Sequence, residues 1–339
     1  MFAGNESVKT SQPPDEGSVC TFCGGEGGAR LYRTKSIFGD EFGLRRCVDC
    51  RAVFLVPRPS AAQLEQAYEE GYYGGGRTKF GPWVEKVLGY FRSSRCRKVA
   101  RLVSRPANIL DVGCGSGEFA KCLVERGYRV CGTELPGKAA ERAAQIAGLT
   151  LKVGPLREGD FGRDYFDAVC MWHVLEHLAE PKKTLDIIGR ILKPGGYVFI
   201  SLPNIGSLQS RLFRGKWLHL DPPRHLFFLG RGDLVAEMGK LGFAPARESH
   251  LSIEQNVFGF QQSILNCLCG RRDMLFEALK GNVEYAGDYP RWKIFLQKGF
   301  WVATFGLFVG AAVLEAALRM GGTVEFVFRK TGTQGCRRV

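Results

Sequence analysis

The sequence predicts an α/β fold built around a parallel, doubly wound sheet, and two observations carry this prediction. Between residues 106 and 252, short apolar segments rich in β-branched residues alternate with segments of helical periodicity. Such alternation is typical of a parallel sheet with helices on both faces. In addition, the first apolar segment, Ile109 to Val112, leads into a tight turn with glycines at alternate positions, and in this class of sheet a ligand binds where the strands end.

The chain has 339 residues, of which 45% are hydrophobic and 24% charged, enough for one large domain and a small one. Its net charge of +13 favours an anionic partner such as nucleic acid, a membrane surface or a phosphorylated substrate, although a basic surface alone explains it equally well. Residues 1–17 are polar and predict a flexible tail without the apolar segment of a signal peptide. The 12 cysteines then favour a reducing compartment, so we expect a cytoplasmic protein.

Four cysteines have the spacing of zinc ligands. They form two Cys-x-x-Cys pairs, Cys20 with Cys23 and Cys47 with Cys50. Two such pairs predict a closed, tetrahedral four-sulfur zinc site with a structural role, and zinc binding would drive the folding of so small a unit. Short strands are predicted around the pairs, within a zinc ribbon that covers residues 18–60, at 31–33, 42–45 and 53–56. Two disulfides or redox-active thiols are the alternatives.

Residues 61–105 predict a helical linker between the ribbon and the sheet. Ser60 can cap a first helix that runs through about Glu70. A second helix is predicted from Trp83 to Ser104, with one apolar and one basic face. The basic face suits solvent or anionic lipid headgroups.

The glycine turn predicts a nucleotide-like ligand. Gly113, Gly115 and Gly117 permit positive φ angles and close approach to the backbone, and the helix behind them offers free N–H groups to a carboxylate or phosphate. Dinucleotide-binding enzymes space their glycines G-x-G-x-x-G, and here the third glycine comes one residue early. Glu134, at the tip of the next predicted strand, is positioned to accept both ribose hydroxyls. A purely structural turn and an ordinary strand-end acid are the alternatives.

The other elements of the core follow from periodicity and turn residues. Helices are predicted at 118–126, 138–147 and 233–241, with another that ends at residue 192. Strands are predicted at 128–133, 151–153, 165–172, 197–202, 242–249 and 323–330.

Several of these segments resemble the class I methyltransferases that depend on S-adenosylmethionine (SAM). They are the Asp-x-Gly-x-Gly-x-Gly turn at 111–117, Tyr-Phe-Asp at 165–167, Leu-Glu-His at 175–177 and Leu-Lys-Pro-Gly-Gly at 192–196. With the zinc ribbon and the segment 54–60, the chain resembles a bacterial subgroup in which a ribbon precedes the core. Members of that subgroup are often linked to modification of surface polysaccharide or lipid.

The resemblance implies a Rossmann-like, seven-stranded methyltransferase sheet with a SAM-binding core at 106–252 and an antiparallel last strand at 323–332. It also implies a set of cofactor-binding residues: Asp111, Gly113, Gly115 and Gly117 around the methionine part of SAM, Glu134 at the ribose, Leu156 at the adenine and His173 in the segment that walls the pocket.

The methyl group of a sulfonium is already activated, so the chain needs alignment of the reactants rather than a covalent nucleophile. An oxygen or nitrogen acceptor usually needs a base as well, and histidine titrates near neutral pH. We expect His225 in this role, with His177 as second choice. His225 and Arg224 belong to a loop that resembles the family's Pro-Arg-His-Leu element, and this resemblance implies that both residues lie on the acceptor side. The alternative is a loop held in place by structural polar contacts.

His173 and His177 have metal-ligand spacing, but Glu176 is not where a zinc protease motif places its glutamate, so we predict no metal there.

Residues 253–322 separate the last two predicted strands and predict a helical, hydrophobic insert. Its uncharged run, 299–314, would be roughly 24 Å long as a helix, less than the roughly 30 Å of a bilayer core. The flanking strands must also lie on one side of any membrane. The insert is therefore a lid, a dimer face or a peripheral membrane contact, and nearby basic residues favour the membrane.

The sequence thus predicts a SAM-dependent methyltransferase with a structural zinc ion. We expect it to act on a hydroxyl or amine of a glycan, a lipid-linked sugar or a related small molecule, at the inner face of the membrane. The alternatives are an RNA methyltransferase, whose ribbon and basic surface bind phosphates, and a non-catalytic assembly factor with a SAM-type fold. The oligomeric state is not predicted.

Overall fold

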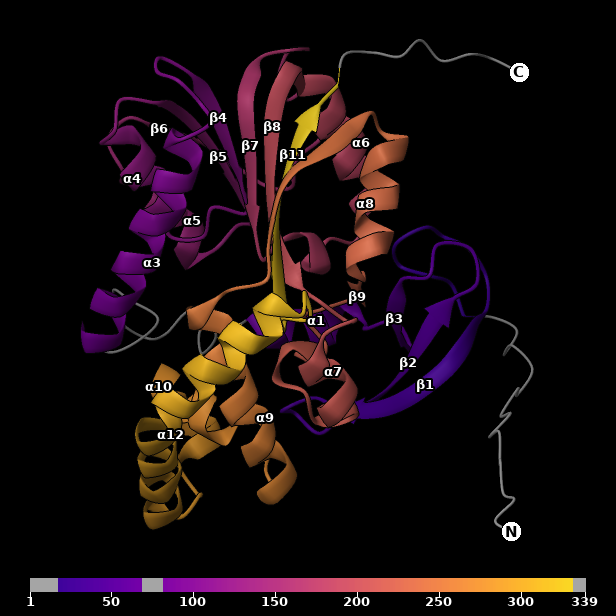
Figure 1. Ribbon diagram of the computed structural model, residues 1–339, viewed down its shortest axis with the longest axis vertical. Coiled ribbons are helices and arrows are strands. Elements are labelled where there is room, and N and C mark those ends of the chain that lie inside the picture. Colours follow the sequence, from indigo (N-terminus) through magenta and orange to yellow (C-terminus); the bar gives the residue numbers. More distant parts are fainter. Residues whose placement is uncertain (1–17, 69–81, 332–339) are drawn as a thin grey trace.

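The structure is a computed structural model that describes residues 18–68 and 82–331. The predicted tail at 1–17 and part of the predicted linker lie outside these residues. A mixed sheet forms the centre of the fold, with the strand order β10-β11-β8-β7-β4-β5-β6 (Figure 1). The strands are β4 (Asn108–Val112), β5 (Arg129–Glu134), β6 (Leu149–Val153), β7 (Phe166–Trp172), β8 (Leu192–Pro203), β10 (Phe243–Ser249) and β11 (Thr323–Lys330).

Strand β11 is antiparallel to both of its neighbours, β8 and β10, whereas β8, β7, β4, β5 and β6 pair in parallel. This confirms the predicted seven-stranded, Rossmann-like sheet with an antiparallel last strand. The central strands are almost continuously apolar because helices cover both of their faces. The parallel strands end at one edge of the sheet, where the glycine turn and the segment after β7 emerge.

The two faces of the sheet have separate cores because successive residues of a strand point to opposite sides. On one face, Leu110, Val169 and Ile200 pack with α6 (Pro181–Ile191) and α8 (Arg231–Lys240). On the other face, Ile109, Cys170 and Phe199 pack with α3 (Pro82–Ala100) and α4 (Glu118–Val124). Figure 1 shows α3 and α4 on one side of the sheet and α6 and α8 on the other, while α5 (Lys138–Ala144) follows β5.

The zinc ribbon has its own antiparallel sheet, in the order β1-β2-β3-β9. Strands β1 (Gly28–Lys35), β2 (Glu41–Cys47) and β3 (Val53–Val56) lie where strands were predicted. The fourth strand, β9 (Phe227–Phe228), comes from the loop that follows β8 in the core, and Val53 and Phe54 of β3 pair with it. Phe22 and Phe227 also pack with their rings 5.2 Å apart. The ribbon is therefore joined to the core sheet and its helices by both a strand pair and a shared hydrophobic cluster.

Helix α1 (Ala61–Tyr68) begins behind Ser60, as predicted. The backbone N–H of Gln63 donates to Oγ of Ser60 at 3.2 Å, and the N–H of Ser60 donates to Oε1 of Gln63 at 3.0 Å. This reciprocal pair is a capping box that satisfies the first free donors of the helix.

The insert is helical, with α9 (Phe258–Leu268), α10 (Met274–Lys280), α11 (Val283–Ala286) and α12 (Arg291–Ala317). Polar side chains that the sequence places along α9 are buried and hold the insert on the core. Asn256, just before α9, donates to the carbonyl of His250 at 2.8 Å and accepts from the N–H of Thr323 at 2.8 Å. Gln261 donates to the carbonyl of Trp301 in α12 at 2.8 Å. Helices α9 and α12 are therefore tied to each other, and the turn before α9 is tied to the residue that follows β10 and to the first residue of β11.

The expectation that the apolar helix is too short to span a bilayer is wrong. Helix α12 has 27 residues, which is about 40 Å, because charged residues at both ends of the uncharged run continue the helix. By length and composition it is the one helix of the described residues that meets the requirement for a membrane span. The topological argument still holds, because β10 and β11 on either side of the insert are paired in one sheet.

Candidate active site and zinc site

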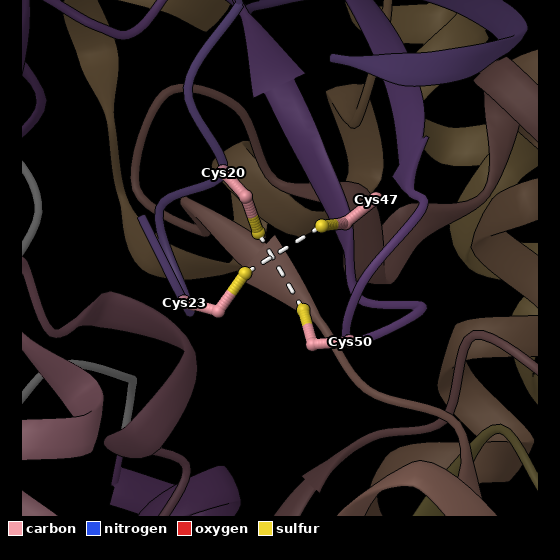
Figure 2. A group of neighbouring side chains, drawn as sticks. All are labelled: Cys20, Cys23, Cys47 and Cys50. Carbon is pink, nitrogen blue, oxygen red and sulfur yellow. Dashed lines mark hydrogen bonds between the residues drawn. The ribbon is translucent and has the colours of Figure 1, made fainter. Parts of the chain in front are cut away.

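The four cysteines of the ribbon point toward a common centre (Figure 2). Sγ of Cys20 lies 3.7 Å from Sγ of Cys50, and Sγ of Cys23 lies 3.5 Å from Sγ of Cys47. A tetrahedral zinc ion with bonds of about 2.3 Å separates its sulfurs by about 3.8 Å, whereas a disulfide needs about 2.05 Å. The thiols are free, so the geometry fits zinc and does not fit the disulfide alternative. Four sulfur ligands leave no open position, so the ion would be structural.

The turn after β4 has the open backbone that a bound cofactor requires. Gly115 has a φ of +59°, and a Cβ added to it would meet no atom within 4 Å, so its free side faces space rather than protein. The N–H of Gly115 donates to Oε2 of Glu134 at 2.6 Å. Gly113 has a φ of +64°, and a Cβ there would lie 2.7 Å from Cγ2 of Val174. The turn is thus in direct contact with the segment that follows β7.

Gly117 is required for packing. It has a φ of +79° at the start of α4, and a Cβ there would lie 2.4 Å from Cδ1 of Ile146. The need for glycine at this position is explained without a cofactor contact.

Two buried carboxylates lie at the ends of neighbouring strands. Burial, reinforced by the charge of Glu134 and opposed by Arg95, raises the pKa of Asp111 to about 8. Burial also raises the pKa of Glu134, against the N–H groups of Gly115 and Leu135. Two buried acids that resist ionisation suit a ligand with positive charge, and SAM carries both an ammonium and a sulfonium group. Each Glu134 oxygen accepts one backbone N–H and retains capacity for a further donor. These residues therefore fit the cofactor that the resemblance implies.

Leu156 is buried in the main hydrophobic cluster of the core. Its contact with the adenine stays a prediction. His173, directly after β7, has a φ of +55°, and its Nε2 lies 3.2 Å from Oγ of Ser201. It stands at the end of β7, one residue before Val174, which touches the cofactor turn; its part in the wall of the pocket stays a prediction.

Beyond His173, a 3₁₀ helix (Leu175–His177) buries Glu176 completely. Nδ1 of His173 lies 3.3 Å from Oε1 of Glu176, and Nε2 of His225 lies 4.0 Å from the same oxygen. Burial opposes ionisation of this carboxyl, but contact with His173 and the charges of the surrounding histidines outweigh it and lower the pKa of Glu176 to about 2.

The structure brings the two predicted bases together. The ring centroids of His177 and His225 are 4.6 Å apart. Nδ1 of His177 lies 3.0 Å from the carbonyl oxygen of Arg224, and Nδ1 of His225 lies 2.7 Å from the carbonyl oxygen of His219. Burial, helped by the charge of His225, lowers the pKa of His177 to about 4, so His177 is neutral at physiological pH.

Arg224 does not reach toward this pair of histidines. Its guanidinium is buried and forms an ion pair with Asp221, with Nε 2.9 Å from Oδ2. It also donates to the carbonyl of Ala67 in α1 at 3.2 Å. This placement favours the alternative that the sequence left open, a residue that pins the loop.

Sequence reasoning missed three residues of the site. Glu176 stood between two candidate histidines in the Leu-Glu-His segment, which was a usable signal. Asp221 lies 3.9 Å from Nε2 of His225, four residues later in the same loop. Tyr68 places its hydroxyl 2.9 Å from Nδ1 of His177, and because it comes from α1, no local pattern could have indicated it.

Comparison with known proteins identifies the core. A family model described as a methyltransferase domain matches residues 88–248. The chain is 36% identical to the ubiquinone biosynthesis O-methyltransferase of Alkalilimnicola ehrlichii over 105 residues, which are 28% of this chain and 41% of that protein. It is 30% identical to the enzyme of the same name from Leptothrix cholodnii over 137 residues, 36% of this chain and 49% of that protein. These matches span less than half the length of either relative.

Among solved structures, a putative sarcosine dimethylglycine methyltransferase from Galdieria sulphuraria superposes with a TM-score of 0.47 at 15% identity, covering 79% of this chain and 97% of that one. A methyltransferase from Mesorhizobium loti that depends on SAM has a TM-score of 0.43 at 16% identity, covering 70% and 96%. Similarity at this level carries no argument about function.

Replacing a ribbon cysteine should remove the zinc. Purified protein should contain one structural zinc ion per chain, and Cys47→Ser should lower the zinc content and loosen residues 18–60 while the core stays folded, because three sulfurs no longer close the site. Metal analysis and hydrogen exchange measure both effects. Cys267→Ser is the matched control, since Cys267 is exposed and outside the cluster. Freshly reduced wild-type protein without zinc would contradict the ribbon assignment.

Removing the strand-end acid should weaken cofactor binding. Glu134→Ala should reduce the affinity for SAM by about 1.5–3 kcal/mol, the usual contribution of hydrogen bonds to a charged group. Calorimetry on the full chain measures this, with Glu125→Ala, which removes an exposed acid at the end of α4, as control. Unchanged affinity in Glu134→Ala would refute the ribose assignment.

The family model, the strand order and the cofactor turn agree with one another. The glycines, the paired acids and the segment after β7 meet at one edge of the sheet, where this fold binds its cofactor. SAM is the cofactor of the matched family. Residues 88–248 of this chain therefore belong to the class I SAM-dependent methyltransferases.

Proposed function

We propose that this chain transfers the methyl group of SAM to a hydroxyl of a small-molecule acceptor, and that the acceptor is a glycan, a lipid-linked sugar or a related compound. SAM supplies an activated methyl group when it is bound. The chain must then hold the acceptor in line with that group, exclude water and promote loss of the acceptor proton.

The observation that carries this proposal is the position of the buried histidines. His177 and His225 lie against each other and beside Glu176. Val174, two residues before Glu176, touches the cofactor turn at Gly113. Groups able to assist proton removal therefore lie next to the glycine turn that would bind the methyl donor. An oxygen acceptor usually requires such groups. The matched relatives named as O-methyltransferases agree with an oxygen acceptor.

A lipid-linked acceptor is supported by the outer face of the insert. Helix α12 exposes a stripe of large apolar side chains: Trp292, Phe295, Leu296, Val302, Phe305, Leu307, Val313 and Leu314. Exposed Arg291, Lys293 and Lys298 lie at one end of the same helix. An apolar stripe with basic residues beside it suits the surface of an anionic membrane.

A pocket next to the basic end supports the same partner. It has a volume of about 390 Å³ and opens between α10, α11 and α12. Ile294 and Phe295 contribute apolar walls, and Arg291 and Lys298 contribute positive charge. This combination suits a lipid with an anionic headgroup.

Loss of the preferred histidine should abolish most of the turnover. His225→Ala should reduce methyl transfer roughly 10²–10⁴-fold, as expected for loss of proton-transfer assistance, and leave SAM affinity nearly unchanged. The assay incubates the chain with SAM and extracts of lipids, glycans or RNA, and detects by mass spectrometry a product heavier by one methyl group. His250→Ala, which removes a buried histidine paired with Glu248 instead, is the control.

Activity of His225→Ala within a few-fold of wild type would exclude His225 from this role. A product found only in the RNA extract would replace the proposed acceptor by RNA. Absence of SAM binding would support the assembly factor.

The exposed stripe should direct the protein to anionic membranes. Wild-type protein should float with vesicles that contain phosphatidylglycerol, less so at high salt. Phe295→Ser with Leu307→Ser should abolish flotation, because it removes exposed apolar surface worth about 25 cal/mol per Å². Phe308, although it belongs to the same uncharged run, is buried inside the insert, so its replacement would test folding instead.

Tyr165→Ser is the control, since Tyr165 is exposed just before β7 and away from the insert. Wild-type protein that stays with the soluble fraction at low salt, as a monodisperse monomer without detergent, would contradict the membrane contact.

A further inference from the structure

The carboxylate of Glu176 is buried without a satisfactory partner. Its side chain is only 1% exposed, and neither Oε1 nor Oε2 makes a hydrogen bond of good geometry within the described residues. A buried carboxylate normally accepts several hydrogen bonds or binds a cation. The nearest potential donor, Nδ1 of His173, lies 3.3 Å from Oε1. Imidazoles therefore surround these two oxygens, but none of them forms a well-directed hydrogen bond that would balance the buried charge.

Two imidazoles surround the same carboxylate. Glu176, His177 and His225 each place a possible ligand atom within 4.8 Å of the other two. Nε2 of His225 is 4.0 Å from Oε1 of Glu176, which is inside the limit of about 4.2 Å that two bonds of about 2.1 Å allow across one ion. Two imidazole nitrogens and one carboxylate oxygen are a donor set that binds divalent transition metals and leaves coordination positions open.

The outer contacts of both histidines are those of metal ligands. Nδ1 of His177 faces the carbonyl of Arg224, and Nδ1 of His225 faces the carbonyl of His219. A carbonyl oxygen can only accept, so Nδ1 of His225 donates to it and Nε2 of His225 is left to face Glu176. Nδ1 of His177 lies between the carbonyl of Arg224 and the hydroxyl of Tyr68, and donation to this carbonyl leaves its Nε2 free in the same way. Histidines that bind metals commonly donate their other ring N–H to a backbone carbonyl in this way.

We infer that Glu176, His177 and His225 bind a divalent transition-metal ion, distinct from the zinc of the ribbon, and that its open positions take the hydroxyl oxygen of the methyl acceptor. Val174 links this cluster to the cofactor turn at Gly113, so the ion would stand beside the methyl donor. It would hold the acceptor oxygen in place and lower the pKa of its hydroxyl, so that the proton leaves to water, the oxygen bonds to the methyl carbon, and the carbon–sulfur bond breaks.

The catalytic consequence rests on the proposed methyl transfer, whereas binding of the ion does not. In this arrangement His225 acts as a ligand and not as the proton acceptor. His173 and His177 have the spacing of a pair of metal ligands, and the sequence predicted no metal there. The inferred site has different ligands, because Glu176 and His225 join His177 and His173 is not part of it.

Direct binding of metal to the full chain tests the inference. Mn²⁺ is followed by electron paramagnetic resonance and Co²⁺ by visible absorption, on protein that retains its ribbon zinc, which thiolates hold in preference to Mn²⁺. Wild-type protein should bind one such ion per chain. Glu176→Gln and His225→Gln, two separate variants of similar shape, should each weaken binding tenfold or more, and His250→Gln should leave it unchanged. The site would be overturned if the wild type showed no saturable binding, or if both cluster variants bound the ion as tightly as the wild type.

A second measurement separates the ion from the methyl transfer. Mild chelation that leaves one zinc per chain should abolish methyl transfer, return of Mn²⁺ or Co²⁺ should restore it, and SAM affinity measured by calorimetry should stay the same. Full activity after chelation would overturn the role of the ion and return His225 to that of a base. Failure to bind SAM would overturn the proposed function alone.

Discussion

The pairing of β3 with β9 is the interaction on which the arrangement of the site depends. It hydrogen-bonds a strand of the zinc ribbon to the two residues that follow the loop with Arg224 and His225. Arg224 ties the same loop to α1 through the carbonyl of Ala67, and the N–H of Leu226 donates to the carbonyl of Glu176 at 2.9 Å. The loop is thus held by the ribbon, the linker and the segment after β7, so the ribbon contributes to the geometry of the active site as well as to its own stability.

Three buried groups of the protein share one electrostatic problem, which is negative charge away from water. Four clustered sulfurs of the ribbon, the strand-end acids Asp111 and Glu134, and the enclosed carboxylate of Glu176 each need a cation or a proton. Zinc would neutralise the ribbon sulfurs, and the positive charges of SAM suit the strand-end acids. The proposed divalent ion would neutralise Glu176. The high cost of a buried unpaired charge therefore applies to all three groups.

The insert reverses the usual distribution of polar and apolar residues. Its buried side holds amides, such as Gln261 and Asn266, which hydrogen-bond between helices. Its outer side holds the apolar stripe of α12, where Phe295 is 74% exposed. Gln261 helps to fix the orientation of α12, because its bonds to Trp301 and Thr304 would be lost if that helix turned. The apolar stripe is therefore presented outward in one orientation, which a lipid surface could use.

The sequence by itself determined the elements with local signals. Strands of the core are visible as apolar runs, the cofactor turn as Gly113 and Gly115 behind Asp111, and the zinc ligands as two closely spaced pairs. Their boundaries shift by only a few residues in the structure, because periodicity and turn chemistry act over neighbouring residues.

Only the tertiary structure decided which distant residues meet. It placed His225 on His177, bound Arg224 to Asp221, and supplied β9 to the ribbon. His177 and the carbonyl of Arg224 are separated by 47 residues, and no local pattern encodes such a contact. It results from how the loop after β8 packs between two sheets, and packing over that distance depends on the shape of the whole core.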